Sequence, residues 1–323
     1  MSGKILIAAH HYQRPEIVAR ADLLGDSYKL AVEASRTDAE YIVLCGVLFM
    51  AESAAILAKS GQKVLIPDWN AGCPMADMID SATAMSVLSR LEDLGGKKAV
   101  PVTYMNSWAD LKALTGREGG SVCTSSNARK IVSHYLDAKS PVFFMPDYNL
   151  GINTARELGL ADSEIRVIRR DGTIESLDGT AGADSGVKMF LWDGFCHVHK
   201  VFTPADVDAA RAKKPGVRVI VHPECSPETV SRADASGSTE VMYRMLRDAP
   251  EGSAWSVGTE ARFVERMISE FPGKDISPLR LSFCHNMNRI DLRNLDETLE
   301  ALRTHEKTGS RLQTIAVSPE EKE

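Results

Sequence analysis

Long apolar stretches are missing from this sequence. The longest, Tyr41 to Ala51, is too short to cross a bilayer. The apolar run at residues 5–9 is too short for the core of a signal peptide, and it is typical of a first core strand. We therefore expect a soluble protein with no membrane partner.

Positive charge is also scarce. The 44 Asp and Glu residues outnumber the 38 Lys and Arg residues, which gives a formal net charge of −6. No basic stripe or recognition helix stands out, so no nucleic-acid partner is expected. The apolar share of 44% is that of a globular protein, and 323 residues can form two or three domains.

The six cysteines include no C-x-x-C pair. This absence weakens the case for zinc ribbons, ferredoxin-type clusters and dithiol redox sites. Cysteines in a chain without a secretory signal are typical of a reduced compartment, where thiols stay free to bind metal. We expect a cytoplasmic protein.

What the sequence does contain is a threefold repeat. In each repeat an apolar strand with a polar end is followed by a hydroxyl-rich segment, a second apolar strand and a cysteine. The cysteines are Cys73, Cys196 and Cys284. Cys73 follows Ser27 by 46 residues, and Cys284 follows Ser238 by the same 46. The pattern predicts three Rossmann-like α/β domains, each β-α-β-α-β before its cysteine, around a shared centre.

Interruptions of this pattern place the domain boundaries. The glycine pair at 95–96 and the Lys-Lys-Pro-Gly segment at 213–216 end the first two repeats. The predicted domains are residues 1–95, residues 96–214 and residues 215–323, the last with a C-terminal helix and tail. The middle repeat carries an insertion near residues 162–187, in which Asp171-Gly172 predicts a hairpin. Apolar spacing predicts helices over residues 14–35 and 75–93.

The three repeated cysteines are candidate metal ligands. A single cysteine is most simply a buried core residue, and we interpret Cys45, Cys123 and Cys225 in that way. The repeated ones each follow a strand and precede a predicted helix, whose N-terminus would stabilise a thiolate. Three ligands leave a coordination position open, as catalytic metals require. Thiolates select zinc or iron–sulfur, and we favour a [4Fe–4S] cluster with one iron free to act as a Lewis acid on substrate.

Polar residues at the strand ends are candidate ligand contacts. They form three i, i+2 pairs whose side chains face the same way in an extended backbone: His10 and Tyr12, Tyr104 and Asn106, His222 and Glu224. Tyr104, His222 and Glu224 are the acid/base candidates. His199, three residues after Cys196, either supports the cluster or contacts the ligand.

Hydroxyl groups lie where helices are expected to begin. They belong to Ser27, Ser125, Ser238 and Thr239. Helix capping explains any one of them alone. Together, three anion-ready turns around a metal favour a small ligand with several negative groups.

Seven motifs, in order along the chain, resemble those of the quinolinate synthase family. They are HHYQRPE (10–16), GDS (25–27), YMNS (104–107), CTSSNA (123–128), PDYNLG (146–151), HPEC (222–225) and GTE (258–260). The match runs from about residue 5 to about residue 302, although residues 162–187 are longer than is usual in the family. The resemblance implies three α/β/α domains related by pseudo-threefold symmetry around a central active site, which holds a three-cysteine [4Fe–4S] cluster.

The resemblance also implies an activity. Members condense iminoaspartate with dihydroxyacetone phosphate to quinolinate, phosphate and water, a step of de novo NAD biosynthesis that couples to an L-aspartate-oxidising enzyme. By position, Cys73, Cys196 and Cys284 look like the cluster ligands. The predicted substrate contacts are His10, Tyr12, Ser27, Tyr104, Asn106, Ser125, His199, His222, Glu224, Ser238 and Thr239.

Two other functions remain open from the residues. An aconitase-type lyase would also use an open iron, but on a single hydroxy acid. An iron–sulfur sensor would need a nucleic-acid surface, which the charge pattern does not supply.

Overall fold

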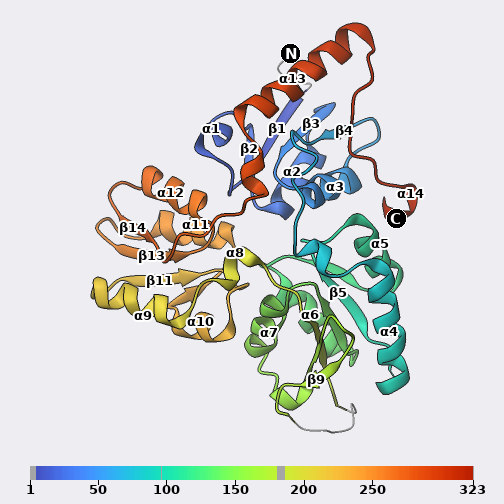
Figure 1. The fold of residues 1–323 in the computed structure, drawn as a ribbon, viewed down its shortest axis with the longest axis vertical. Coiled ribbons are helices and arrows are strands. Elements are labelled where there is room, and N and C mark those ends of the chain that lie inside the picture. The colour runs from blue at the N-terminus through green and yellow to red at the C-terminus, as the bar shows by residue number, and fades with distance from the viewer. Residues whose placement is uncertain (1–4, 96, 180–185, 323) are drawn as a thin grey trace.

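The computed structural model describes residues 5–95, 97–179 and 186–322. The strands form three sheets with helices packed between and around them (Figure 1). The three α/β units stand around a common centre near α8 (His197–Lys200), which confirms the predicted fold class. Among the described residues, no helix is both long enough and apolar enough to cross a membrane.

The first unit has a four-stranded parallel sheet in the order β2-β1-β3-β4. Its elements are β1 (Ile5–His10), α1 (Pro15–Val18), β2 (Leu23–Gly25), α2 (Ser27–Arg36), β3 (Tyr41–Cys45), α3 (Leu48–Leu57) and β4 (Lys63–Leu65), followed by η1 (Ala76–Met78) and α4 (Ser81–Gly95). All five residues of β3 are buried, as expected for a strand covered on both faces.

The predicted helix over residues 14–35 is wrong. The chain breaks it with β2, which pairs with the end of β1. Asp22 fixes the break, because its carboxylate accepts a hydrogen bond from the Ile7 amide at 2.8 Å while its own amide donates to the Ile7 carbonyl. The predicted helix over 75–93 is likewise split, into η1 and α4.

The second unit contains the insertion. Its elements are β5 (Val100–Tyr104), α5 (Ala109–Arg117), β6 (Ser121–Cys123), α6 (Ala128–Asp137), β7 (Val142–Met145), α7 (Tyr148–Glu157), η2 (Asp162–Glu164), β8 (Ile165–Ile168), β9 (Ile174–Ser176) and β10 (Met189–Trp192). The predicted hairpin is confirmed, because β8 and β9 pair antiparallel around a turn in which Gly172 has φ 86°. The hairpin extends the sheet away from the centre, and residues 180–185 of the insertion lie outside the described residues.

The third unit repeats the first. Its elements are α9 (Pro204–Lys213), β11 (Arg218–Val221), α10 (Pro227–Arg232), β12 (Ala235–Ser236), α11 (Thr239–Asp248), β13 (Ala254–Gly258), α12 (Ala261–Glu270) and β14 (Asp275–Pro278). Its sheet order is β12-β11-β13-β14. The second sheet, β6-β5-β7-β10-β8-β9, begins with the same four-strand arrangement and adds the parallel β8 and the antiparallel β9. Each unit also has a short second strand (β2, β6 or β12) that the predicted β-α-β-α-β pattern omitted.

The C-terminal segment returns to the first unit. It contains η3 (Met287–Arg289), α13 (Leu292–Thr308) and α14 (Pro319–Lys322). Figure 1 shows α13 beside the first sheet, and the Ile315 amide donates to the Val64 carbonyl on β4 at 2.8 Å. The domain boundaries at residues 95/96 and 214/215 stay a prediction. We propose these boundaries as the divisions between the three sheets. Residues 292–322 are the exception, because they return to cover the first sheet.

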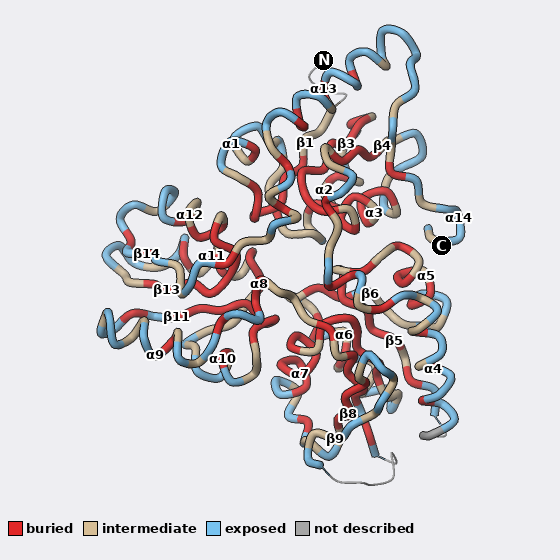
Figure 2. Tube along the Cα trace, in the orientation of Figure 1, coloured by how far each residue is buried: buried red, intermediate tan, exposed pale blue. Residues whose placement is uncertain are grey.

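Strand direction explains why one centre serves three units. Apart from β9, the strands of each unit run parallel, so their carboxyl ends meet at one edge of the sheet, where α/β proteins bind ligands. His10 ends β1, Tyr104 ends β5, and His222 directly follows β11. Figure 2 shows the buried strands of all three units leading toward the middle of the molecule.

Candidate active site

The carboxyl ends of the three sheets enclose a cavity of about 80 Å³. Thirteen of the fourteen residues predicted for the site line it. They are His10, Tyr12, Ser27, Cys73, Tyr104, Asn106, Ser125, Cys196, His199, His222, Glu224, Thr239 and Cys284. Ser238 is the exception. Other lining residues, which the sequence did not single out, include Met105, Thr124 and Met287.

The three cysteines sit in equivalent backbone turns. In each unit the amide four residues beyond the cysteine donates to the cysteine carbonyl, at 3.2 Å for Cys73, 3.0 Å for Cys196 and 3.0 Å for Cys284. In each unit, too, a helix-start amide donates to the carbonyl two residues before the cysteine. The same local structure therefore presents a half-buried thiol to the cavity three times.

The thiols are electrostatically coupled and strongly desolvated. Burial raises the pKa of Cys73 to about 12 and that of Cys284 to about 11, and it also raises the pKa of Cys196. Amide hydrogen bonds to sulfur lower the pKa in the first two cases, from residues two and three positions further along. A thiolate at this place consequently needs a cation nearby. Cys45, Cys123 and Cys225 instead lie fully buried in the apolar core, away from the cavity.

Glu224 forms the polar centre of the cavity with two histidines. His199 Nδ1 donates to Glu224 Oε2 at 2.5 Å, and His222 Nδ1 lies 3.5 Å from the same oxygen. The two imidazoles stack with centroids 4.2 Å apart and planes 11° apart. Burial by itself raises the pKa of Glu224, but His199 and His222 outweigh it and lower that pKa to about 2. Burial lowers the pKa of His222 to about 3, so a neutral ring faces an ionised carboxylate.

A hydrogen-bond chain orients His199. Because Nδ1 donates to Glu224, Nε2 of a neutral ring is an acceptor. It faces the hydroxyls of Tyr12 at 3.3 Å and Thr259 at 3.2 Å, which bond to each other at 2.8 Å. Glu224 Oε1, by contrast, is buried and accepts no hydrogen bond of standard geometry within the described chain. Tyr104 lies beside this carboxylate, and burial raises the Tyr104 pKa well above its usual range.

Two histidines at strand ends make the same type of hydrogen bond with the backbone. His10 Nδ1 accepts the Tyr12 amide at 3.1 Å, and His222 Nδ1 accepts the Glu224 amide at 3.3 Å. Burial lowers the pKa of both rings. Each neutral ring therefore carries its proton on Nε2, where it can donate into the cavity.

The predicted hydroxyls divide into two groups. Asp26 caps α2 and Ser238 caps α11, so Ser27 and Thr239 occupy the first helical positions. The Ser27, Ser125 and Thr239 hydroxyls make no hydrogen bond to other described residues, and all three line the cavity. Ser238 accepts from the Val241 amide and from the Ser126 hydroxyl, and its predicted substrate contact stays a prediction.

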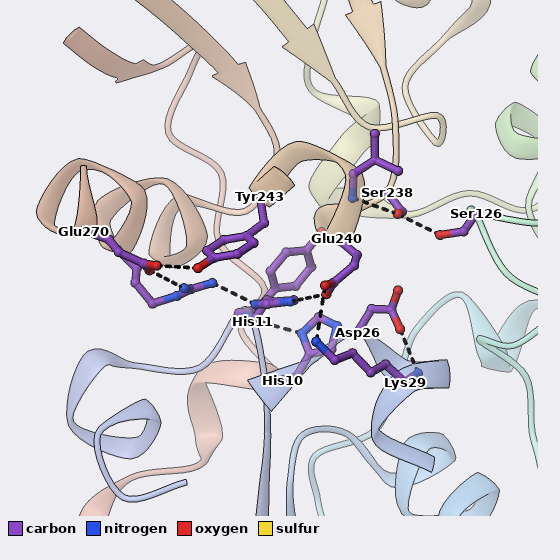
Figure 3. A network of polar contacts seen from close by, with 12 residues as sticks. His10, His11, Asp26, Lys29, Ser126, Ser238, Glu240, Tyr243 and Glu270 are labelled. Carbon is purple, nitrogen blue, oxygen red and sulfur yellow. Dashed lines mark hydrogen bonds and ion pairs between the residues drawn. The ribbon is translucent and has the colours of Figure 1, made fainter. Parts of the chain in front are cut away.

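A polar network closes the junction between the first and third units (Figure 3). His11 donates to Glu240 Oε2 at 3.0 Å and accepts from Arg266 at 2.8 Å, and Lys29 on α2 pairs with the other Glu240 oxygen at 3.2 Å. Nothing in the sequence singles out His11, since its partners lie more than 200 residues away. Ser126 and Ser238 make a similar link between the second and third units.

Two groups of side chains could hold a metal. The Cys196, His199 and Glu224 ligand atoms lie within 4.8 Å of one another, a spacing suited to a single ion. Cys73, Cys196 and Cys284 offer three thiols to the same cavity. The groups share Cys196, so either of them would hold a metal at the same cavity.

Comparison with known proteins agrees with this geometry. A family model described as NadA, Quinolinate synthetase A protein, matches residues 2–322. A quinolinate synthase from Geobacillus sp. (strain WCH70) is 45% identical over 319 residues, which cover 98% of this chain and 85% of that protein. The quinolinate synthase of Streptomyces coelicolor is 45% identical over 309 residues, or 94% of this chain and 78% of its own.

A third relative gives the same result. The quinolinate synthase of Bacillus pumilus (strain SAFR-032) is 42% identical over 310 residues, which cover 95% of this chain and 83% of that protein. The match of the family model thus spans all three units. The chain belongs to the quinolinate synthase family, a family of enzymes of NAD biosynthesis.

Proposed function

We propose that the protein condenses iminoaspartate with dihydroxyacetone phosphate to quinolinate, phosphate and water. The observation that carries the proposal is the meeting of three equivalent thiols and an ionised Glu224–histidine group in one cavity. Three hydroxyls without internal partners complete its wall, and they suit a ligand with carboxylate or phosphate groups.

The donor set fits a [4Fe–4S] cluster bound by Cys73, Cys196 and Cys284. Their chemistry is that of soft thiolate ligands, and the amide hydrogen bonds to two of the sulfurs favour the ionised form. When bound, the cluster supplies one open, Lewis-acidic iron to the substrate. Three thiolates would then be used by the cluster, leaving His199 and Glu224 for substrate and proton transfer.

The protein's own residues supply binding and proton transfer. Ser27, Ser125 and Thr239 would hold anionic groups through their hydroxyls, two of them with the amides of a helix start. His10 and His222 would donate from Nε2 to substrate oxygen. Glu224 would accept a proton at Oε1, the oxygen that accepts no hydrogen bond of standard geometry in the described chain. Tyr104 beside it would return a proton to a leaving hydroxyl.

The substrates imply a supplier and a compartment. An imine hydrolyses in water, so iminoaspartate must be made nearby by an L-aspartate-oxidising enzyme. All six cysteines are free thiols, which suits the reducing cytoplasm.

Anaerobic purification tests the proposal. We expect about four iron and four sulfide per chain, with charge-transfer absorption in the visible range. Phosphate release should require both iminoaspartate and dihydroxyacetone phosphate. Turnover of a single hydroxy acid without the triose phosphate would instead support an aconitase-type lyase. One metal ion per chain without sulfide would support the Cys196, His199 and Glu224 group and refute the cluster.

A further inference from the structure

Two buried carboxylates outside the cavity lining hold equivalent positions in the second and third units. Asp147 directly precedes α7 beyond β7, and Glu260 directly precedes α12 beyond β13. Both side chains are 0% exposed, and within the described chain neither has an ion-pair partner. Burial of a carboxylate without a counterion is costly, so its hydrogen bonds matter to the folded state.

Each carboxylate uses both of its oxygens, one toward a helix and one toward a cysteine. Asp147 Oδ1 accepts from the Leu150 amide at 2.6 Å, while Oδ2 accepts from the Cys196 amide at 3.1 Å. Glu260 Oε2 accepts from the Arg262 amide at 2.7 Å, and Oε1 accepts from the Cys284 amide at 3.3 Å.

Helix capping alone does not require these groups. Ser226, Ser238 and Thr203 cap α10, α11 and α9 with a hydroxyl and bury no charge. What a carboxylate adds is a second acceptor oxygen at a fixed distance from the first. In both units that second oxygen meets the amide of a predicted cluster ligand.

The first unit shares a backbone hydrogen bond with the other two units but lacks the capping carboxylate. In every unit the first helical amide donates to the carbonyl two residues before the cysteine: Leu48 to Ala71, Tyr148 to Gly194 and Ala261 to Ser282, at 2.7, 2.9 and 2.7 Å. Val47 occupies the capping position of the first unit and offers no carboxylate. The capping residue of the first unit therefore cannot tie the Cys73 amide, whereas those of the other two units each accept from a cysteine amide.

We propose that Asp147 and Glu260 are positioning residues for the metal centre. Each ties the amide of its cysteine to the start of a packed helix, which fixes the direction in which the thiolate enters the cavity. The inference deepens the proposed function and rests on its three-cysteine ligand set. Groups that orient metal ligands in this way typically change metal affinity by about 10–100-fold when they are altered.

Asp147→Asn and Glu260→Gln test the tie selectively. An amide side chain keeps one acceptor oxygen for the helix, but its NH₂ group cannot accept from the cysteine amide. Asp291→Asn is the matched control, because Asp291 caps α13 by accepting from the Asn294 amide at 2.9 Å and has no contact with a cysteine. Asp147→Ser, which keeps a capping hydroxyl, replaces Asp147→Asn if that variant does not fold.

Cd²⁺ titration of the anaerobic apo-protein is the measurement, because its thiolate charge-transfer absorption grows with each sulfur bound. We expect the two amide variants to bind Cd²⁺ about 10–100-fold more weakly and with a smaller absorption amplitude. Asp291→Asn should match the wild type, and thermal unfolding should stay similar in all the proteins compared.

Two results would overturn the inference. One is wild-type affinity and amplitude in both amide variants, and the other is a wild-type protein with no three-thiolate absorption. Failure of the wild type to assemble a [4Fe–4S] cluster from iron and sulfide would refute the proposed function alone. The Cd²⁺ comparison would still decide whether the carboxylates position their cysteines.

Discussion

Glu224 illustrates how single residues in this molecule obtain their chemistry from neighbours. Its carboxylate is 2% exposed, yet it is ionised because two imidazoles surround one of its oxygens. The other oxygen has no partner of standard geometry in the described chain. We propose this carboxylate as the proton acceptor because it lies beside Tyr104, His199 and His222 in the cavity.

Glu224→Gln should therefore separate proton transfer from binding. The substitution keeps the shape of the side chain but removes the base, so we expect kcat to fall by roughly 10²–10⁴-fold. The iron and sulfide content should not change. Tyr104→Phe should have a similar effect if its hydroxyl transfers a proton. Steady-state kinetics checks both variants, and near-normal kcat in both would assign proton transfer to other residues, with His199 and His222 next in position.

The six cysteines provide a second test at the residue scale. Ser in place of Cys73, Cys196 or Cys284 should remove most of the iron–sulfur absorption, because each contributes one thiol to the cavity. Ser in place of Cys45, Cys123 or Cys225 should leave the absorption intact, since these lie in the core. Spectra of anaerobically purified variants decide the matter. A full cluster in Cys196→Ser would contradict the ligand assignment.

At the scale of elements, the proposed anion-binding groups lie at or near helix starts. Asp26 and Ser238 satisfy the amides of α2 and α11 as caps, which leaves the hydroxyls of Ser27 and Thr239 for a ligand. Ser125 lies in the loop before α6 and has the same freedom. Three units thus each contribute one uncommitted hydroxyl to the cavity.

Alanine at Ser27, Ser125 or Thr239 should weaken binding of dicarboxylates that chelate iron. Each substitution should cost about 1–3 kcal/mol, the typical value for a hydrogen bond to a charged group. The measurement is inhibitor titration followed by the absorption or paramagnetic resonance of the cluster. Unchanged inhibition in all three variants would mean that these hydroxyls serve only the local backbone.

At the scale of the whole molecule, the cavity exists only while three units stay together. Glu240 is central to one junction, because it joins α11 to Lys29 on α2 and to His11 beyond β1 (Figure 3). Hydrogen bonding by His11 and the charge of Lys29 lower the pKa of Glu240 to about 2, below its usual 4.5. A depressed carboxyl pKa stabilises the folded state above pH 4.5, and that stabilisation is lost as pH falls toward 2.

Glu240→Gln should therefore destabilise the apo-protein in a pH-dependent way. We expect its free energy of unfolding to be lower than that of the wild type by about 1 kcal/mol at neutral pH. The difference should shrink as pH falls from 4.5 toward 2, because the wild-type carboxylate becomes protonated. Urea unfolding at several pH values measures it, with Glu300→Gln on exposed α13 as control. A difference independent of pH would show that charge at Glu240 does not hold the units together.

The sequence by itself determined the α/β class, the hairpin of the insertion and the residues that gather at the centre. It could do so because apolar strands are continuous and repeat, and because spacing equivalent to Ser27–Cys73 recurs in the third unit. The local sequence pattern does not predict β2, because its three residues become a strand only by pairing with β1.

Only the tertiary structure decided the polar contacts. His11 meets Glu240 across 229 positions, and His199 meets Glu224 from another unit. The sequence does not show which groups Asp147 and Glu260 contact. Each carboxylate meets its cysteine amide only when the helix start and the following loop pack together. Periodicity along a chain records which face of an element is buried. It does not record which buried polar atoms from distant elements will meet.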